Sequence, residues 1–177
     1  MALLTINSEL QEWNAFYSAV AGVAGVLVGL LFVALALSPA VMKDTAPPGL
    51  RVWCSETFHS LVVMLSFALI LLIPNPSGAG IGIPIALIAL FGLRQIRTDI
   101  LNLRTDPNPR WSQGHAGIRR FIYMIVAEIV AIAVGISLIL NRSEMIDWMV
   151  LPIFLILINA AINCWDILKE IGNMPSA

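Results

Sequence analysis

Charged residues are scarce in this chain. Lys, Arg, Asp and Glu make up 12% of its 177 residues, and 59% of the residues are apolar. Soluble domains carry about 25% charged residues, so this composition excludes an ordinary soluble protein and favours a membrane protein. A mean hydropathy of +0.88 agrees with that class. Because spans take up most of the chain, we expect no soluble catalytic domain.

Cysteine and histidine are also scarce, with two of each. Cys54 and Cys164 stand 110 positions apart, and neither they nor His59 and His115 have the spacing of a metal site. The chain also lacks a nucleophile elbow, an HExxH helix and a phosphate-binding glycine loop. We therefore expect no metal, no cofactor and no enzymatic activity.

Long apolar runs are what the chain does have. The first, from Trp13 to Leu37, contains 25 residues and no charge, and about 20 apolar residues suffice to cross a bilayer. At helical spacing one stripe of this run is formed by small and polar residues: Asn14, Ser18, Ala21, Gly22, Gly25, Gly29 and Ala36. Small residues let helix backbones approach closely in lipid, so the stripe predicts a helix-packing surface. We expect this helix to be the central packing spine.

Four further runs complete the prediction of an all-α bundle of five spans in one membrane domain, residues 1–177. The predicted spans are 13–37, 51–73, 80–97, 119–140 and 148–168, with an Arg-rich connection at 98–118. The third run is short, contains Gly82 and Pro84, and reaches bilayer length only by continuing through Arg97. We expect its helix to leave the membrane and to follow the surface until Asp106–Pro109 stops it.

Basic residues are divided unequally between the two sides of this bundle. With the N-terminus outside, nine of them fall in cytoplasmic segments and only Arg142 falls in an outer one. The nine are Lys43, Arg51, Arg94, Arg97, Arg104, Arg110, Arg119, Arg120 and Lys169. Lys and Arg are enriched in cytoplasmic connections, so the asymmetry predicts an outside N-terminus and a cytoplasmic C-terminus.

Six arginines near the third and fourth spans predict contact with lipid headgroups. They are Arg94, Arg97, Arg104, Arg110, Arg119 and Arg120. A basic residue near an anionic membrane surface contributes about 1 kcal/mol of attraction. Docking of a partner protein is the alternative, with Trp111 as a contact hot spot. These arginines are not interleaved with exposed aromatics, so we expect no nucleic-acid binding.

Ionisable and amide side chains also occur inside three predicted spans, where each charged group costs about 2.5–3.5 kcal/mol to insert. They are Glu56 and His59 in the second span, Glu128 in the fourth, and Asn159, Asn163 and Asp166 in the fifth. Neighbours on one span stand three or four residues apart, so they share a helix face. At about 1.5 Å per residue, all except Asp166 lie roughly 8–14 Å from the cytoplasmic end of their helix, which predicts one interior cluster.

This cluster is consistent with two roles. In the first, it is a hydrogen-bonded lock between helices, with a protonated Glu128 bonded to Asn159 or His59 and with Glu56 near the basic rim. In the second, it is a proton or cation site open to the cytoplasm. Glu128 and His59 would then carry protons, and Asn159 and Asn163 would supply oxygen ligands.

Short strings occur along the chain in a characteristic order: Trp13, Gly29–Ala34, Glu56-Thr57, Leu71–Pro74, Asn159-Ala160 and Asn163–Trp165. In this order they resemble a family of small, uncharacterised bacterial integral membrane proteins with five spans. Relatives would carry an Arg three residues before the glutamate, where this chain has Trp53, with Arg51 two residues earlier. The resemblance implies a five-span membrane fold and no established activity.

The sequence therefore favours an accessory, structural or regulatory component of a membrane assembly in a bacterial plasma membrane. Its expected partners are the lipid bilayer and either further copies of itself or a larger membrane complex. The alternative is a small homo-oligomeric channel or a transporter coupled to protons or cations. That function would use the polar cluster in the cytoplasmic half of the bundle.

Overall fold

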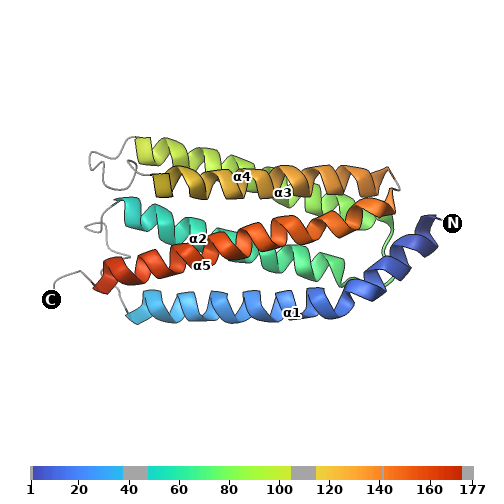
Figure 1. Cartoon of the computed structure of the whole chain (residues 1–177), viewed down its shortest axis with the longest axis horizontal. Coiled ribbons are helices and arrows are strands. Elements are labelled where there is room, and N and C mark those ends of the chain that lie inside the picture. The colour runs from blue at the N-terminus through green and yellow to red at the C-terminus, as the bar shows by residue number, and fades with distance from the viewer. Residues whose placement is uncertain (1, 38–47, 105–114, 141, 173–177) are drawn as a thin grey trace.

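The computed structural model describes residues 2–37, 48–104, 115–140 and 142–172. Every element in these ranges is helical (Figure 1). The elements are α1 (Ala2–Leu37), α2 (Pro48–Leu71), α3 (Gly78–Arg104), α4 (His115–Ile139), the 3₁₀ helix η2 (Ser143–Met149) and α5 (Val150–Gly172).

Five helices in the described ranges are long and apolar enough to cross a membrane. This confirms the all-α class and the predicted number of candidate spans. The helix bounds differ from the prediction mainly at α1 and α3. α1 begins at Ala2, well before Trp13, because Ile6 and Leu10 are buried and extend its apolar contact.

α3 continues beyond the predicted span 80–97, in keeping with the expected extension of this helix toward Asp106. It continues through Pro84 as one helix to Arg104, and α4 begins at His115, so both ends of the predicted connection at 98–118 are helical. Ile96 is buried, so this part of α3 packs against the bundle. The predicted stop at Asp106–Pro109 lies outside the described residues.

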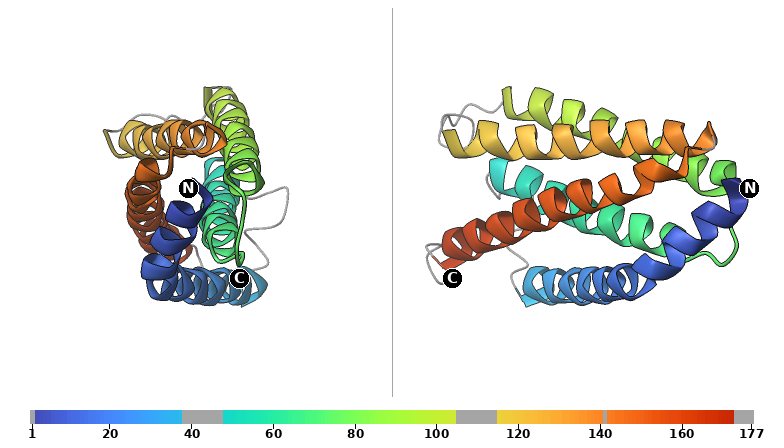
Figure 2. Two further views of the ribbon diagram at one scale, coloured as in Figure 1. Left: turned by 90° about the vertical axis from the view of Figure 1, so that its right-hand side faces the viewer. Right: turned by 45° about the vertical axis from the view of Figure 1, so that its right-hand side comes forward.

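The helices form three layers across the bundle. Figures 1 and 2 show α3 and α4 side by side at one edge, α2 and α5 in the middle, and α1 at the opposite edge. α1 packs mainly along α2. Phe67, Met124 and Ile156 come from the three helices that meet in the core and are fully buried. α1 begins and α5 ends at opposite ends of the long axis (Figure 1).

The expectation that α1 is the central spine is wrong. Its most apolar window is 17% buried, against 56% for α2. Tyr17, Ala24 and Leu31 are seven residues apart and form its buried stripe. At about 100° per residue, Gly22 and Gly25 point roughly a quarter turn or more away from that stripe. The chain therefore leaves the small-residue face of α1 uncovered.

At the other edge of the bundle, α3 and α4 approach each other closely. A Cβ atom added at Gly82 would lie 2.5 Å from the carbonyl oxygen of Gly135, and one added at Gly135 would lie 2.8 Å from the carbonyl oxygen of Gly82. The two main chains thus touch directly, and only glycine fits at either position.

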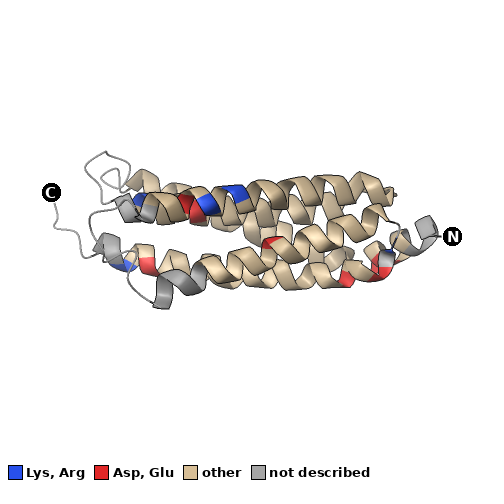
Figure 3. Cartoon of the chain, turned by 90° about the horizontal axis from the view of Figure 1, so that it is seen from above, with Lys and Arg blue, Asp and Glu red and all other residues tan. Residues whose placement is uncertain are grey.

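Most described basic residues belong to one end of the bundle, with acidic residues among them (Figure 3). Arg51, Arg94, Arg97 and Lys169 belong to the helix halves near the end of α5, whereas Arg142 follows α4 at the other end. Further acidic residues lie at that other end, where Glu9 of α1 is near Glu144 and Asp147 of η2. Trp13 Nε1 donates a hydrogen bond of 2.9 Å to Asp147 Oδ1 and joins α1 to η2.

Candidate functional site

Glu56 is the centre of a buried polar contact between α2 and α5. Its Oε1 accepts a hydrogen bond of 2.9 Å from Asn159 Nδ2, and its Oε2 accepts one from Asn163 Nδ2. All three side chains are buried, with Glu56 only 6% exposed. Asn159 and Asn163 are four residues apart, so both amides project from one face of α5.

Ser60 extends this contact toward α4. It stands one turn after Glu56 and donates a hydrogen bond of 2.7 Å to the Glu56 backbone carbonyl. Its hydroxyl also lies 3.3 Å from Glu56 Oε1 and 3.5 Å from Met124 Sδ. Hydrogen bonds to a carboxylate are stronger than those between neutral groups, so this contact fixes α2 against α5.

Unused acceptors remain in the same contact. Asn159 Oδ1 and Asn163 Oδ1 are buried and have no hydrogen-bond partner among the described residues. With the Glu56 carboxylate they place several oxygen atoms from two helices close together. Oxygen atoms of this kind accept a proton-bearing group or bind a hard cation.

Glu128 lies elsewhere, between α4 and α3. It is fully buried, and neither carboxyl oxygen has a hydrogen-bond partner in the described part of the chain. The carboxyl group occupies the space above Gly92, where an added Cβ would overlap Glu128 Oε1. The expected bond from Glu128 to Asn159 or His59 is therefore not formed, because Glu128 faces the gap that Gly92 leaves in α3.

His59 contacts Phe91, the residue that precedes Gly92 in α3. Its ring lies 5.8 Å from the Phe91 ring, centroid to centroid, and its Nε2 has no partner among the described residues. His59 and Glu128 thus reach consecutive positions of α3 from α2 and α4. Neither joins the contact around Glu56.

Asp166 takes a third position, nearer the C-terminal end of α5. One carboxyl oxygen lies 3.6 Å from Lys169 Nζ, and the Asp166 side chain is 28% exposed. The six polar residues predicted as one cluster therefore occupy three places: around Glu56, along α3 and at the basic rim.

The other predicted site residues lie on the outside of the bundle. Ser18, Gly22, Gly25 and Gly29 are exposed on α1, and Ala21 is half-buried. Arg94 and Arg97 are exposed on α3. The side chains of Arg104, Arg119 and Arg120 lie outside the described part of the chain, as does the whole of Arg110.

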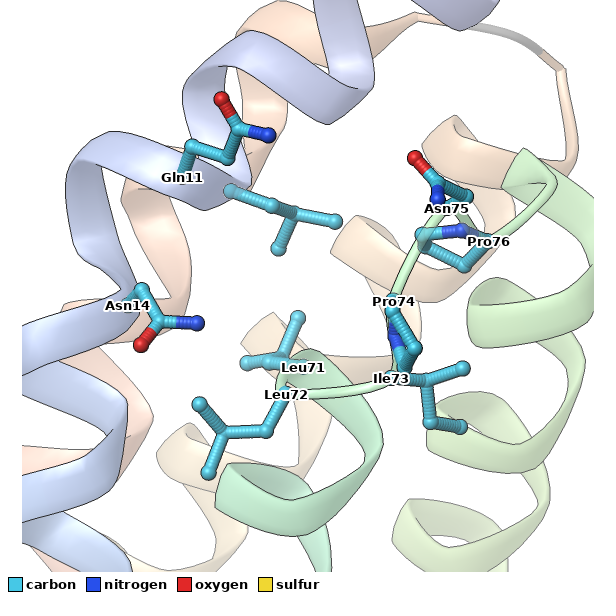
Figure 4. Close-up of a pocket in the computed structure, with 9 residues that line it drawn as sticks. Gln11, Asn14, Leu71, Leu72, Ile73, Pro74, Asn75 and Pro76 are labelled. Carbon is cyan, nitrogen blue, oxygen red and sulfur yellow. The ribbon is translucent and has the colours of Figure 1, made fainter.

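A small cavity of about 180 Å³ lies at the N-terminal end of the bundle (Figure 4). Gln11 and Asn14 of α1 face Leu72 and the turn between α2 and α3 across it. Asn75 in that turn has a φ of 50°, a left-handed conformation that asparagine adopts more readily than most residues. The site offers amides and apolar groups but no charge.

Metal-binding groups are not gathered in the described residues. No set of three or more His, Cys, Asp or Glu side chains there is placed to hold a metal ion. Cys54 and Cys164 carry free thiols.

Comparisons with protein families, curated proteins and solved structures found no match. The family resemblance carried by the short strings stays a prediction, and the functional argument rests on the geometry of this chain.

Sequence reasoning missed three partners in these contacts. The contact of Ser60 could have been found from the sequence, since Ser60 stands four residues after Glu56 on the same helix face. Gly92 and Asp147 had none, because the roles of both depend on which helices are neighbours.

Proposed function

We propose that this chain is an accessory, structural or regulatory component of a membrane assembly and that it packs through the outward face of α1. The observation that carries the proposal is the open space beside Gly22, Gly25 and Gly29. A Cβ added at any of the three would meet nothing within 4 Å.

The cost of these glycines supports an external partner. A glycine in a helix interior is about 1 kcal/mol less favourable than alanine. Gly82, Gly92 and Gly135 offset that cost by admitting a backbone or side chain of a neighbouring helix. The α1 glycines admit nothing within this chain, and a second helix packed on them would gain the close contact that drives association in lipid.

The proposal includes an orientation and a location. With the N-terminus outside and the C-terminus cytoplasmic, Arg51, Arg94, Arg97 and Lys169 face the cytoplasm, in keeping with the preference of basic residues for that side. The membrane would be a bacterial plasma membrane, and the expected partner is another copy of the chain or a larger complex.

Native mass spectrometry of the protein extracted with its lipid tests the proposal. We expect either a discrete oligomer or a stoichiometric second chain, and we expect Gly25→Leu to abolish it. Val23→Trp is the control, because it adds bulk at an exposed position about 100° or more around α1 from each of the three glycines. A wild-type chain that is released as a monomer would contradict the proposal.

A second candidate function is a small homo-oligomeric channel or a transporter coupled to protons or cations. It is favoured by buried polar atoms of Glu128, His59, Asn159 and Asn163 that have no hydrogen-bond partner within the described ranges. In liposomes we then expect a flux whose pH dependence is lost in Glu128→Gln. Absence of flux from the wild-type protein would exclude this function.

A further inference from the structure

A polar cleft of about 420 Å³ opens between α2 and α3. It is lined by Arg51, Val52, Ser55, Gln95, Asp99 and Asn102. The lining combines one cation, one carboxylate, two amides and a hydroxyl. None of these residues except Arg51 was singled out by the sequence pattern.

The two charged residues of the cleft differ in exposure. Arg51 is exposed, whereas Asp99 is only 4% exposed. Asp99 Oδ1 accepts a hydrogen bond of 3.2 Å from Gln95 Nε2. A carboxylate has about four acceptor sites, so Asp99 retains capacity for further donors. A ligand that carries both an anionic and a cationic group would match this pair.

The depth of the cleft coincides with the ends of two candidate spans. These spans cover Leu50–Leu71 and Gly78–Asn102, so Arg51 and Asn102 stand at their limits. The cleft therefore lies at the level where a membrane-spanning bundle meets lipid headgroups.

An exposed apolar stripe on α3 leads to the edge of the cleft. Leu87, Phe91 and Gln95 follow one another at intervals of four residues, so each lies about one turn from the next, and Gln95 lines the cleft. Leu87 is 60% and Phe91 56% exposed. Asp99 and Phe91 are separated by about 12 Å along the helix, which places an apolar surface below a polar one.

We propose that this cleft binds the headgroup of a zwitterionic phospholipid with a primary amine, of the phosphatidylethanolamine type. Arg51 binds the phosphate, and Asp99 accepts hydrogen bonds from the ammonium group. One acyl chain lies along Leu87 and Phe91. A choline headgroup fits less well, because its quaternary ammonium has no N–H to donate to Asp99. The proposal is independent of the assembly function.

Lipid retention by the full chain tests this assignment. The protein is released from micelles containing phosphatidylethanolamine, phosphatidylcholine or phosphatidylglycerol with the same acyl chains, and bound lipid is counted by native mass spectrometry. We expect the ethanolamine lipid to be retained roughly 10-fold better than either of the others, since a charge-assisted hydrogen bond separates them. Equal retention of all three lipids by the wild-type protein would overturn the proposal without any variant.

Two variants assign the roles. Asp99→Asn is expected to remove the preference for ethanolamine over choline, and Arg51→Gln to weaken retention of every phospholipid. Glu144→Gln and Arg142→Gln are the matched controls, because both residues are exposed and neither lines the cleft. An unchanged preference in a folded Asp99→Asn protein would refute the ammonium contact.

Soluble glycerophosphoethanolamine distinguishes the lipid from its free headgroup. It lacks the acyl chains that would lie along Leu87 and Phe91, so at equal concentration we expect it not to displace the lipid. Equal competition would show that the cleft takes the free headgroup instead, and the lipid assignment would fail.

Discussion

Between α3 and α4, the main chains at Gly82 and Gly135 approach so closely that a Cβ on either residue would overlap a carbonyl oxygen of the other helix. Along α1, Gly22, Gly25 and Gly29 have open space at the same atom. Glycine thus lets two helices pack closely at one edge of the bundle, whereas at the other edge no helix of this chain packs on the glycines. The difference indicates that a glycine face becomes a packing surface only through what lies opposite it.

The largest change in the free energy of unfolding is expected at the contact between α3 and α4. Gly82→Val should lower the free energy of unfolding by about 3 kcal/mol, because its side chain must displace the backbone of α4. Denaturant titration in mixed micelles measures this change. Gly25→Val is the matched control and should change the stability of the monomer by less than about 0.5 kcal/mol. Similar losses in the two variants would remove the distinction between the two edges.

A polar contact in the middle layer provides an intermediate case. Glu56→Leu should cost about 2 kcal/mol, because Asn159 and Asn163 lose the acceptor of their buried amide groups. Glu56→Gln should cost less, since its amide oxygen still accepts one of these bonds. The same titration measures both variants. Equal stability of Glu56→Leu and wild type would show that apolar packing alone joins α2 to α5.

Loss of the hydrogen bond that joins α1 to η2 should lower the stability by less than the two changes above. Trp13→Phe removes the hydrogen bond to Asp147 and keeps an aromatic ring near Phe16 and Tyr17. We expect a loss of about 1 kcal/mol and faster hydrogen exchange in the first turns of α1. A Trp13→Phe protein with unchanged exchange in this segment would show that apolar contacts suffice to hold it.

The smallest change in stability is expected on the glycine face of α1, and it should be an increase rather than a loss. Gly22→Ala should raise the stability of the isolated monomer by about 0.5 kcal/mol, because the helix loses less backbone entropy and nothing lies in the way of the new methyl group. In the proposed assembly the same change should weaken association. A monomer destabilised by Gly22→Ala would mean that this face is already packed within the chain.

The positions of the helices along the chain could be predicted from the sequence because length and apolarity are local properties. Five runs predicted five candidate spans, and the structure contains them. The extension of α3 beyond Arg97 was predicted, but its burial was not, since Arg97 and Asp99 are typical of an exposed helix. Ile96 and Asp99 are nevertheless buried there against neighbouring helices.

Contacts between helices could be predicted only in part. The spacing of Asn159 and Asn163 placed both amides on one face, but it did not say which carboxylate they meet. Glu56 and Glu128 are predicted at similar depths in the membrane, so either could have been the acceptor for the two amides. Glu128 instead fills the space that Gly92 leaves on α3, and Glu56 accepts both hydrogen bonds. The position of α1 was mispredicted for the same reason, since its glycines identify a packing face without identifying its partner.

The bond between Glu56 and Asn159 also has a consequence for biosynthesis. The two residues are 103 positions apart, and Asn159 belongs to α5, which leaves the ribosome well after α2. At a synthesis rate of about 5–20 residues per second, Glu56 exists for roughly 5–20 s before its amide partners are made. During that interval the carboxyl group of the second helix lacks its two amide donors, so we expect its stable burial to follow the synthesis of the fifth.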